Sequence, residues 1–160
     1  MDVRSPETSF LGSHVNKIDA KGRVAVPADF RRALEAERDQ GFYCLKGVRE
    51  PRLECGGGDF ITFYKREIGL LPAFTDPREK LEEAIFGSVR RLTFDTEGRV
   101  VIPEDYRAYA NLQDRVLFQG RGDTFLILNA EEAERRIAAT REAAREALMR
   151  LHTPKTGSGQ

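Results

Sequence analysis

Two arginines, Arg23 and Arg99, are the residues of this chain whose type and spacing most clearly suggest a chemical role. Each ends the same pattern, Asp-x-x-Gly-Arg, which begins at Asp19 and at Asp95. A guanidinium that projects from such a turn can bind phosphate, and it can grip the edge of guanine through two hydrogen bonds. The same spacing also allows each arginine to pair with the aspartate four residues earlier and simply to tie down the turn. The two interpretations are compatible, because the aspartate can orient the arginine.

Both patterns belong to a longer repeat. Residues 19–31 recur as residues 95–107 at a constant offset of 76 (95 minus 19), with Asp, Gly, Arg, Val, Pro, Asp and Arg matching position for position. A repeat this regular indicates two copies of one supersecondary unit, so any site on the unit is presented twice. Doubled, oriented presentation suits an elongated, repetitive partner such as DNA better than one small substrate.

The two turns differ in charge at one position, where Lys21 of the first copy corresponds to Glu97 of the second. The difference predicts that the first copy is the more basic and the stronger DNA-contacting half. Arg4, His14 and Lys17 flank the first turn and could extend a basic face. The pairs Arg31-Arg32 and Arg90-Arg91 are more typical of solvated helix faces and strand ends than of direct base readout.

The turns must be held by short strands. Gly22 and Gly98 are expected at positive φ, which a Cβ would disfavour, and Asp19 and Asp95 are expected to accept a hydrogen bond from the backbone two residues on. Strands are predicted on both sides of each turn, at 15–18 and 24–26 in copy one and at 91–94 and 100–102 in copy two.

A helix and a second β pair follow in each copy. Pro27 and Pro103 open helices that run to about Ala36 and Ala110. The second β pair is predicted at 42–45 and 60–64 in copy one and at 116–118 and 124–128 in copy two. The link 46–59 is expected to be an irregular loop, since its Gly56-Gly57-Gly58 lacks the Gly-Lys-Ser/Thr ending of a phosphate-binding loop. Two halves of four strands each can cover their apolar faces by forming one small barrel, so the predicted class is mainly β with flanking helices (α+β).

Two further helices are expected outside the repeats. Asp76 as N-cap and Pro77 at the first helical position begin one between the copies, with Leu81, Ile85 and Phe86 buried. A long helix from Asn129 to about Leu151 carries a narrow apolar stripe, and the tail 153–160 is expected to be disordered.

Composition excludes several classes of function. The 160 residues carry 26 basic and 26 acidic side chains, a balance that argues against a generic sticky nucleic-acid binder but allows basic residues clustered on one face. With only two histidines and no matched nucleophile and base, we expect no enzyme, no metal site, no cofactor and no small-molecule ligand. Cys44 and Cys55 are interpreted as free thiols. No apolar run approaches the roughly 20 residues that span a bilayer, and the N-terminus is no secretory signal, so we expect no membrane association and a cytoplasmic location.

With this doubled turn, the sequence resembles the MraZ family, which consists of bacterial proteins with tandem SpoVT/AbrB-like repeats. The resemblance covers about residues 10 to 135 and rests on segments 10–12, 18–24, 26–28, 95–103 and 116–129. It implies a swapped-hairpin AbrB-like β-barrel formed by both repeats of one chain. The expected organisation is an N-terminal extension (1–11), repeat one (12–64), a helical linker (65–88), repeat two (89–134), and a C-terminal helix with its tail (135–160).

The resemblance also implies a function. Members are sequence-specific DNA-binding transcriptional regulators, usually repressors, that form homo-oligomeric rings. They bind direct repeats in double-stranded DNA upstream of the division and cell wall gene cluster, including their own gene, and they associate with the nucleoid. The family's DNA-contacting positions match Lys21, Arg23 and Arg99, while Glu97 stands where the family often has Lys or a small residue. The alternative is a protein-interaction module similar to AbrB-like antitoxins. Such a module is expected to have an extended, partner-binding tail rich in acidic and aromatic residues, and residues 153–160 contain neither.

Overall fold

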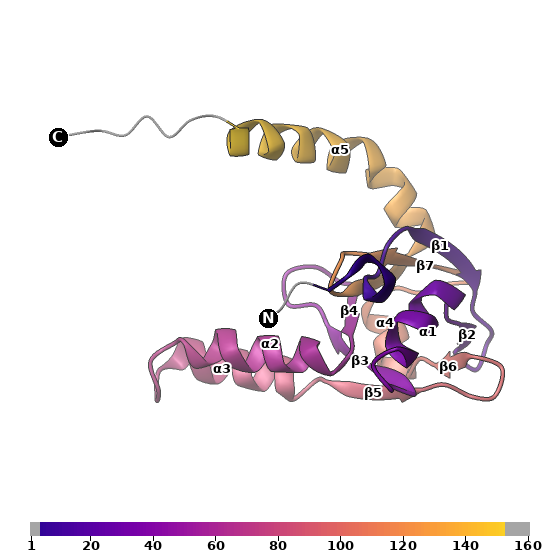
Figure 1. Cartoon of the computed structure of the whole chain (residues 1–160), viewed down its shortest axis with the longest axis horizontal. Helices are drawn as coiled ribbons and strands as arrows, with labels where there is room; N and C mark the ends of the chain where they lie inside the picture. Colours follow the sequence, from indigo (N-terminus) through magenta and orange to yellow (C-terminus); the bar gives the residue numbers. More distant parts are fainter. Residues whose placement is uncertain (1–3, 153–160) are drawn as a thin grey trace. The chain divides into compact units, whose positions relative to one another are not determined.

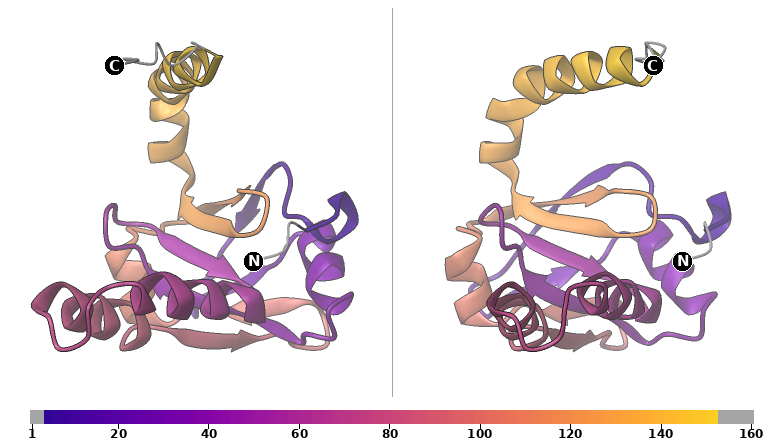
Figure 2. Two further views of the ribbon diagram at one scale, coloured as in Figure 1. Left: turned by 60° about the vertical axis from the view of Figure 1, so that its left-hand side comes forward. Right: turned by 90° about the vertical axis from the view of Figure 1, so that its left-hand side faces the viewer.

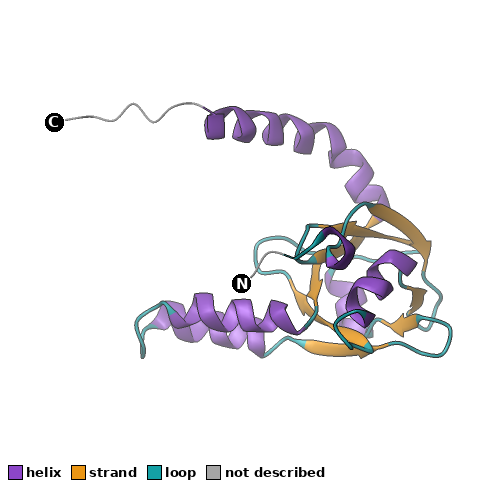
Figure 3. Ribbon diagram, in the orientation of Figure 1, coloured by secondary structure: helices purple, strands orange, loops and turns teal. Residues whose placement is uncertain are grey.

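The structure, a computed structural model, describes residues 4–152, and the predicted disordered tail lies outside this range. The chain divides after Ala130 into two compact units. The strands of the first unit are β1 (Ser13–Lys17), β2 (Arg23–Ala25), β3 (Gly41–Lys46), β4 (Leu53–Gly56), β5 (Arg90–Thr93), β6 (Arg99–Val101), β7 (Arg115–Gly120) and β8 (Phe125–Asn129). Its helices are the 3-10 turn η1 (Pro6–Thr8), α1 (Ala28–Glu35), α2 (Gly58–Gly69), α3 (Asp76–Phe86) and α4 (Glu104–Tyr109). The predicted α+β class is confirmed, and both sheets are antiparallel (Figure 3).

The larger sheet interleaves the two copies of the repeat. Its six strands lie in the order β1-β7-β8-β4-β3-β5, and every neighbouring pair is antiparallel. The first strand of each copy therefore pairs with the third strand of the other copy, β1 with β7 and β5 with β3 (Figure 1). The order reads the same when the copies are exchanged, as a pseudo-twofold axis requires.

The smaller sheet lies on that pseudo-axis. It contains β2 and β6 alone, with Val24 opposite Val100, two residues separated by the repeat offset of 76 (100 minus 24). The pairing extends symmetrically, because the amide of Val26 donates to the carbonyl of Gly98 at 3.1 Å and the amide of Ile102 donates to the carbonyl of Gly22 at 2.8 Å. The second strand of each copy is thus bonded to the turn of the other.

An aromatic core joins the two copies. Phe30 of α1 lies against Phe125 of β8, with ring centroids 5.1 Å apart, and Phe42 of β3 contacts the same ring at 5.1 Å. All three side chains are completely buried, as are Phe10 and Phe118. The same core includes Leu34 of α1, Tyr106 of α4 and Ala110. Burying such rings removes a large apolar area from water and stabilises both copies together.

The strand predicted at 60–64 is wrong, because these residues lie within helix α2. Phe60 and Ile68 are buried and Tyr64 packs beside them, at the i, i+4, i+8 spacing of one helix face. The link 46–59 is not an irregular loop throughout, since it contains β4, the true fourth strand of copy one. A Cβ at Gly56 would lie 2.7 Å from the Cβ of Phe60, so the glycine run allows strand β4 to turn closely into α2.

Helix α3 packs against α2 in a second, smaller apolar cluster (Figure 2). It begins at Asp76 with Thr75 as N-cap, one residue before the predicted cap, so Pro77 stands at the second helical position. Ile85 is buried as predicted, while Leu81 and Phe86 are partly buried.

Helix α5 (Ala130–His152) begins at the last residue of the first unit, and its remaining residues are the described part of the second unit. The side chains of its apolar stripe are exposed, 56% for Ile137, 56% for Leu148 and 80% for Leu151. No described helix has the length and apolar character needed to cross a membrane. The two cysteines lie opposite each other on β3 and β4 as free thiols, with their Sγ atoms 3.5 Å apart, and burial raises the pKa of Cys55.

Candidate nucleic-acid interface

The first turn is built around one carboxylate. The Oδ1 atom of Asp19 accepts hydrogen bonds from the amides of Lys21 and Arg23, both at 2.9 Å, and its Oδ2 atom accepts one from Nε of Arg23 at 2.6 Å. The amide of Gly22 donates to the carbonyl of Asp19 at 3.0 Å, and Gly22 has a φ of 87°. The predicted positive φ and the predicted aspartate bond are both confirmed. The aspartate orients the arginine, whose side chain remains 41% exposed.

The second turn repeats this geometry. Oδ1 of Asp95 accepts from the amides of Glu97 at 2.8 Å and Arg99 at 2.9 Å, and Oδ2 accepts from Nε of Arg99 at 2.9 Å. Gly98 has a φ of 76°. Because β2 and β6 pair with each other, both turns lie beside this ladder at one edge of the first unit, on the right-hand side of Figure 1.

Hydrogen bonds to the carboxylates set their protonation. The pKa of Asp19 is lowered, first by the backbone amide of Arg23 and then by its guanidinium. The pKa of Asp95 is lowered in the same way by the amide of Arg99. Hydrogen bonds to the charged form of a carboxylate favour that form, so both turns hold an ionised aspartate at neutral pH.

The arginines of the two turns differ in their surroundings. Arg99 forms a second ion pair with Glu97 at 3.4 Å, in addition to its pair with Asp95. Its pKa is raised by the hydrogen bond to Asp95 and by the charges of Asp95, Glu97 and Asp19. In the described part of the chain, Arg23 is paired with Asp19 alone and Lys21 forms no ion pair. The cations of the first turn are therefore the freer ones to meet an anionic partner.

Each turn glycine is also contacted by the other copy. A Cβ at Gly22 would lie 2.5 Å from the carbonyl oxygen of Ile102 and 2.9 Å from Nε of Arg107. A Cβ at Gly98 would lie 2.7 Å from Cζ of Arg31. Sequence reasoning treated Arg31 as a solvated helix residue and did not single out Arg107. Their matched positions in the repeat were the one signal that could have identified them.

Three of the other basic residues that flank the turns form ion pairs within the protein. Arg90 pairs with Asp105 at 3.1 Å, Arg91 pairs with Asp39 at 2.6 Å, and Arg32 pairs with Asp29. The three arginine side chains remain exposed, in agreement with the interpretation of solvated helix faces and strand ends.

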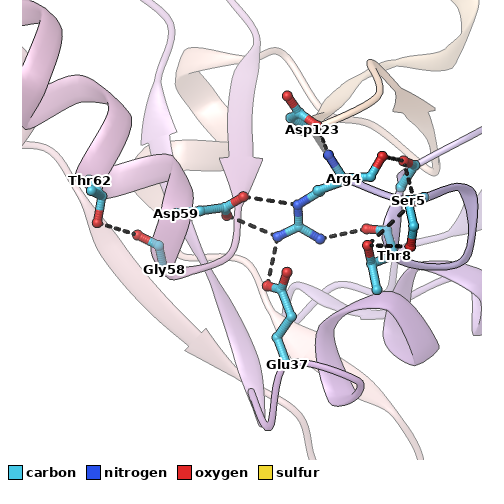
Figure 4. Close-up of polar contacts among 9 residues, drawn as sticks. Arg4, Ser5, Thr8, Glu37, Gly58, Asp59, Thr62 and Asp123 are labelled. Carbon is cyan, nitrogen blue, oxygen red and sulfur yellow. Dashed lines mark hydrogen bonds and ion pairs between the residues drawn. The ribbon is translucent and has the colours of Figure 1, made fainter. Parts of the chain in front are cut away.

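Arg4 does not extend a basic face, because its side chain is only 3% exposed (Figure 4). Its guanidinium donates to both carboxylate oxygens of Asp59 at 2.9 Å and to Glu37 at 2.8 Å, and it lies 4.9 Å from the ring centroid of Phe10. The backbone amide of Arg4 also donates to Asp123 at 3.4 Å. The buried guanidinium ties the N-terminal segment to α2 and to Glu37, which follows α1, and it is not accessible to an external phosphate.

No cluster of three or more His, Cys, Asp or Glu side chains that could hold a metal ion occurs within residues 4–152. His14 lies edge-on to Phe30, with ring centroids 5.5 Å apart, so it is part of the packing around α1. Among the described residues, the paired turns are the candidate place for a functional contact.

Comparison with known protein sequences identifies the class to which this chain belongs. The chain is 35% identical over 160 residues to a protein of Parvibaculum lavamentivorans, covering 95% of this chain and 99% of that one. It is 34% identical over 137 residues to a protein of Xanthobacter autotrophicus, covering 86% and 87%. Both relatives are named "Transcriptional regulator MraZ". They belong to a class of regulators, not of enzymes.

The family described as "MraZ protein, putative antitoxin-like" matches residues 85–151, which contain the second turn and most of α5. With this match and the two relatives, the chain belongs to the MraZ family of transcriptional regulators. The predicted family and the predicted non-enzymatic nature are confirmed.

Proposed function

We propose that the protein is a sequence-specific regulator that binds double-stranded DNA through its paired turns. The observation that carries the proposal is the pair of Asp-x-x-Gly-Arg turns joined by the β2–β6 ladder. Lys21, Arg23 and Arg99 are the residues proposed to contact DNA. Asp19, Gly22, Asp95 and Gly98 shape the turns that present them. Cations from such turns suit phosphates and guanine edges, which are concentrated along a DNA groove.

The scaffold that we propose for this site is a swapped-hairpin AbrB-like β-barrel made by both repeats, 12–64 and 89–134, with 65–88 as the linker between them. Three observations support closure of the barrel. A bridge joins Ile18 to Val24, and the amides of Asp19 and Asp95 donate to the carbonyls of Arg23 at 3.1 Å and Arg99 at 2.8 Å. These bonds link β1 to β2 and β5 to β6, and the β2–β6 ladder connects the two ends of the larger sheet.

A ring of several copies that binds direct repeats upstream of its own gene would suit the charge of the chain. One copy offers only a few phosphate contacts, those of Lys21, Arg23 and Arg99, and the zero net charge of the chain adds no general attraction to DNA. Linked copies that engage several repeats at once gain affinity without new contacts in each one. We extend the proposal to repression of the division and cell wall gene cluster, in the cytoplasm and at the nucleoid.

The test is binding of the purified protein to the duplex that lies immediately upstream of its own coding sequence, over a series of salt concentrations. A shuffled duplex of the same length is the control. We expect tight, salt-dependent and sequence-dependent binding that Arg23→Ala weakens about 100-fold, with unchanged thermal unfolding. Equal binding of the native and shuffled duplexes would contradict sequence specificity. Wild-type affinity in the Arg23→Ala variant would contradict the assignment of the site.

A second candidate is a protein-interaction module of the antitoxin kind, and the observation that favours it is the wording "antitoxin-like" in the family description. The two candidates separate in the same experiment. A protein-interaction module without promoter binding would leave wild type and Arg23→Ala equally weak on both duplexes.

A further inference from the structure

Arg31 of α1 and Arg107 of α4 occupy matched positions of the two copies, separated by the repeat offset of 76 (107 minus 31). Each bonds first to its own copy. Nε of Arg31 donates to the carbonyl of Val26 at 3.2 Å, and Nε of Arg107 donates to the carbonyl of Ile102 at 3.0 Å. Both guanidinium groups are thereby fixed at the end of a second strand, next to the turn of the opposite copy.

The two arginines then differ in what they do for that turn. Nη1 of Arg107 donates to the carbonyl of Ala20 at 3.3 Å, so this side chain bonds inside the first turn as well as lying over Gly22. Arg31 packs over Gly98, but among the described residues it has no corresponding bond to Thr96. The first turn is therefore held from the second copy more firmly than the second turn is held from the first.

The chemistry of arginine suits this bridging contact. Its guanidinium is planar and presents donors in a fixed fork, so Nε and Nη1 can join two carbonyls at a set separation. The flat group also packs against a backbone that has no Cβ. Lysine would keep the charge but would lose the fork and the flat contact.

We propose that Arg107 is a positioning residue for the first turn and acts on it from the second copy. It fixes the backbone of Ala20 and Gly22, and with it the direction in which Lys21 and Arg23 project. Holding a loop in its bound conformation reduces the ordering cost of binding. The inference rests on the proposed function, in which the first turn binds DNA.

The test compares Arg107→Lys with its matched control Arg31→Lys on the upstream duplex. We expect Arg107→Lys to weaken binding about tenfold, the effect of one charge-assisted hydrogen bond, and Arg31→Lys to weaken it by less than about threefold. An arginine that acted only as a positive charge near a phosphate would be replaced well by lysine. Wild-type affinity in Arg107→Lys would therefore overturn the positioning role.

A double-mutant cycle shows which turn Arg107 acts through. Binding is measured at low salt, where Arg23→Ala retains measurable affinity, and we expect the Arg107→Lys effect to shrink to less than about twofold in that background, because coupled residues are not additive. The same loss in both backgrounds would overturn the inference while leaving the proposed function intact. Equal binding by wild type and Arg23→Ala would instead contradict the proposed function, and the positioning role would fail with it.

Hydrogen exchange in the absence of DNA tests the inference even if Arg107→Lys lowers the stability of the protein. The amide of Gly22 is bonded to the carbonyl of Asp19 within the turn. We expect hydrogen exchange at this amide to become about tenfold faster in Arg107→Lys than in wild type, while exchange at Gly98 in the same sample stays unchanged. Equal acceleration at both glycines would indicate general loosening and would overturn a specific effect on the first turn.

Discussion

The two turns have the same backbone and opposite charge. Residues 19–23 carry two cations and one anion, whereas residues 95–99 carry two anions and one cation. The shared geometry uses only the main-chain amides of Lys21 and Glu97, whose side chains take no part in the turn's hydrogen bonds. The comparison shows that the Asp and Gly positions determine the backbone conformation of the turn. The exposed position between them can vary in charge without altering it.

Substitution of the turn glycines compares how much each turn contributes to the stability of the fold. A Cβ at Gly22 meets the backbone oxygen of Ile102, which cannot move easily, whereas a Cβ at Gly98 meets the flexible end of Arg31. We expect Gly22→Ala to lower the free energy of unfolding by about 3 kcal/mol and Gly98→Ala by about 1–2 kcal/mol, since both also force Ala to a positive φ. Urea denaturation measures both. Equal losses would mean that the positive φ dominates and that the contact between copies contributes little.

The arginines of the two turns allow their proposed contacts with DNA to be compared. We expect Arg23→Ala to weaken binding to the upstream duplex about 100-fold and Arg99→Ala about fivefold, because Arg99 is already neutralised by two carboxylates. A fluorescence anisotropy titration at fixed salt measures both. The reverse order would show that the second turn is the main contact.

Charge exchange sharpens the comparison. Glu97→Lys converts the second turn to the charge pattern of the first, and we expect it to strengthen binding about tenfold and to steepen the salt dependence by about one unit of slope. Lys21→Glu is the matched opposite change, and it is expected to weaken binding. If Glu97→Lys changed neither affinity nor slope, the second turn would lie away from the phosphates.

The smallest expected effect is that of pH on the two aspartates. Their folded-state pKa values are lowered, so between the folded and unfolded values the unfolded chain binds more protons. The stability that they contribute is fully present above their unfolded pKa of about 4 and is lost as the pH falls through the folded values. We expect the difference in unfolding free energy between wild type and an Asp19→Asn, Asp95→Asn double variant to shrink from neutral pH to about pH 3. A constant difference would contradict this linkage.

Local chemistry made the turns predictable from sequence. Gly22, Gly98 and the two aspartates follow rules that operate within four residues, and the repeat located them twice. The same repeat led us to expect two matching halves, and this expectation produced the wrong strand at 60–64. An apolar run such as Phe60 to Tyr64 fits a strand or one face of a helix, and tertiary packing against α3 decided for the helix.

Contacts between distant residues could not be predicted in this way. Arg4 was expected on a basic face because it lies near the first turn in sequence, yet Glu37 and Asp59 enclose it. The bond from Arg107 to Ala20 spans 87 residues and depends on how the two copies interleave. The assignment of Lys21, Arg23 and Arg99 to DNA contact stays a prediction.

The pairing of Val24 with Val100 has a consequence for orientation. Two identical chains around such an axis would form an interface with true twofold symmetry, which looks the same from either end. Here one chain supplies both halves, and the two turns differ because Lys21 of the first corresponds to Glu97 of the second. The two ends of the interface are therefore not equivalent. If the protein binds DNA through both turns as proposed, it has a polarity along the duplex. Successive copies that all point the same way match sites repeated in one direction, and inverted sites would set alternate copies against one another.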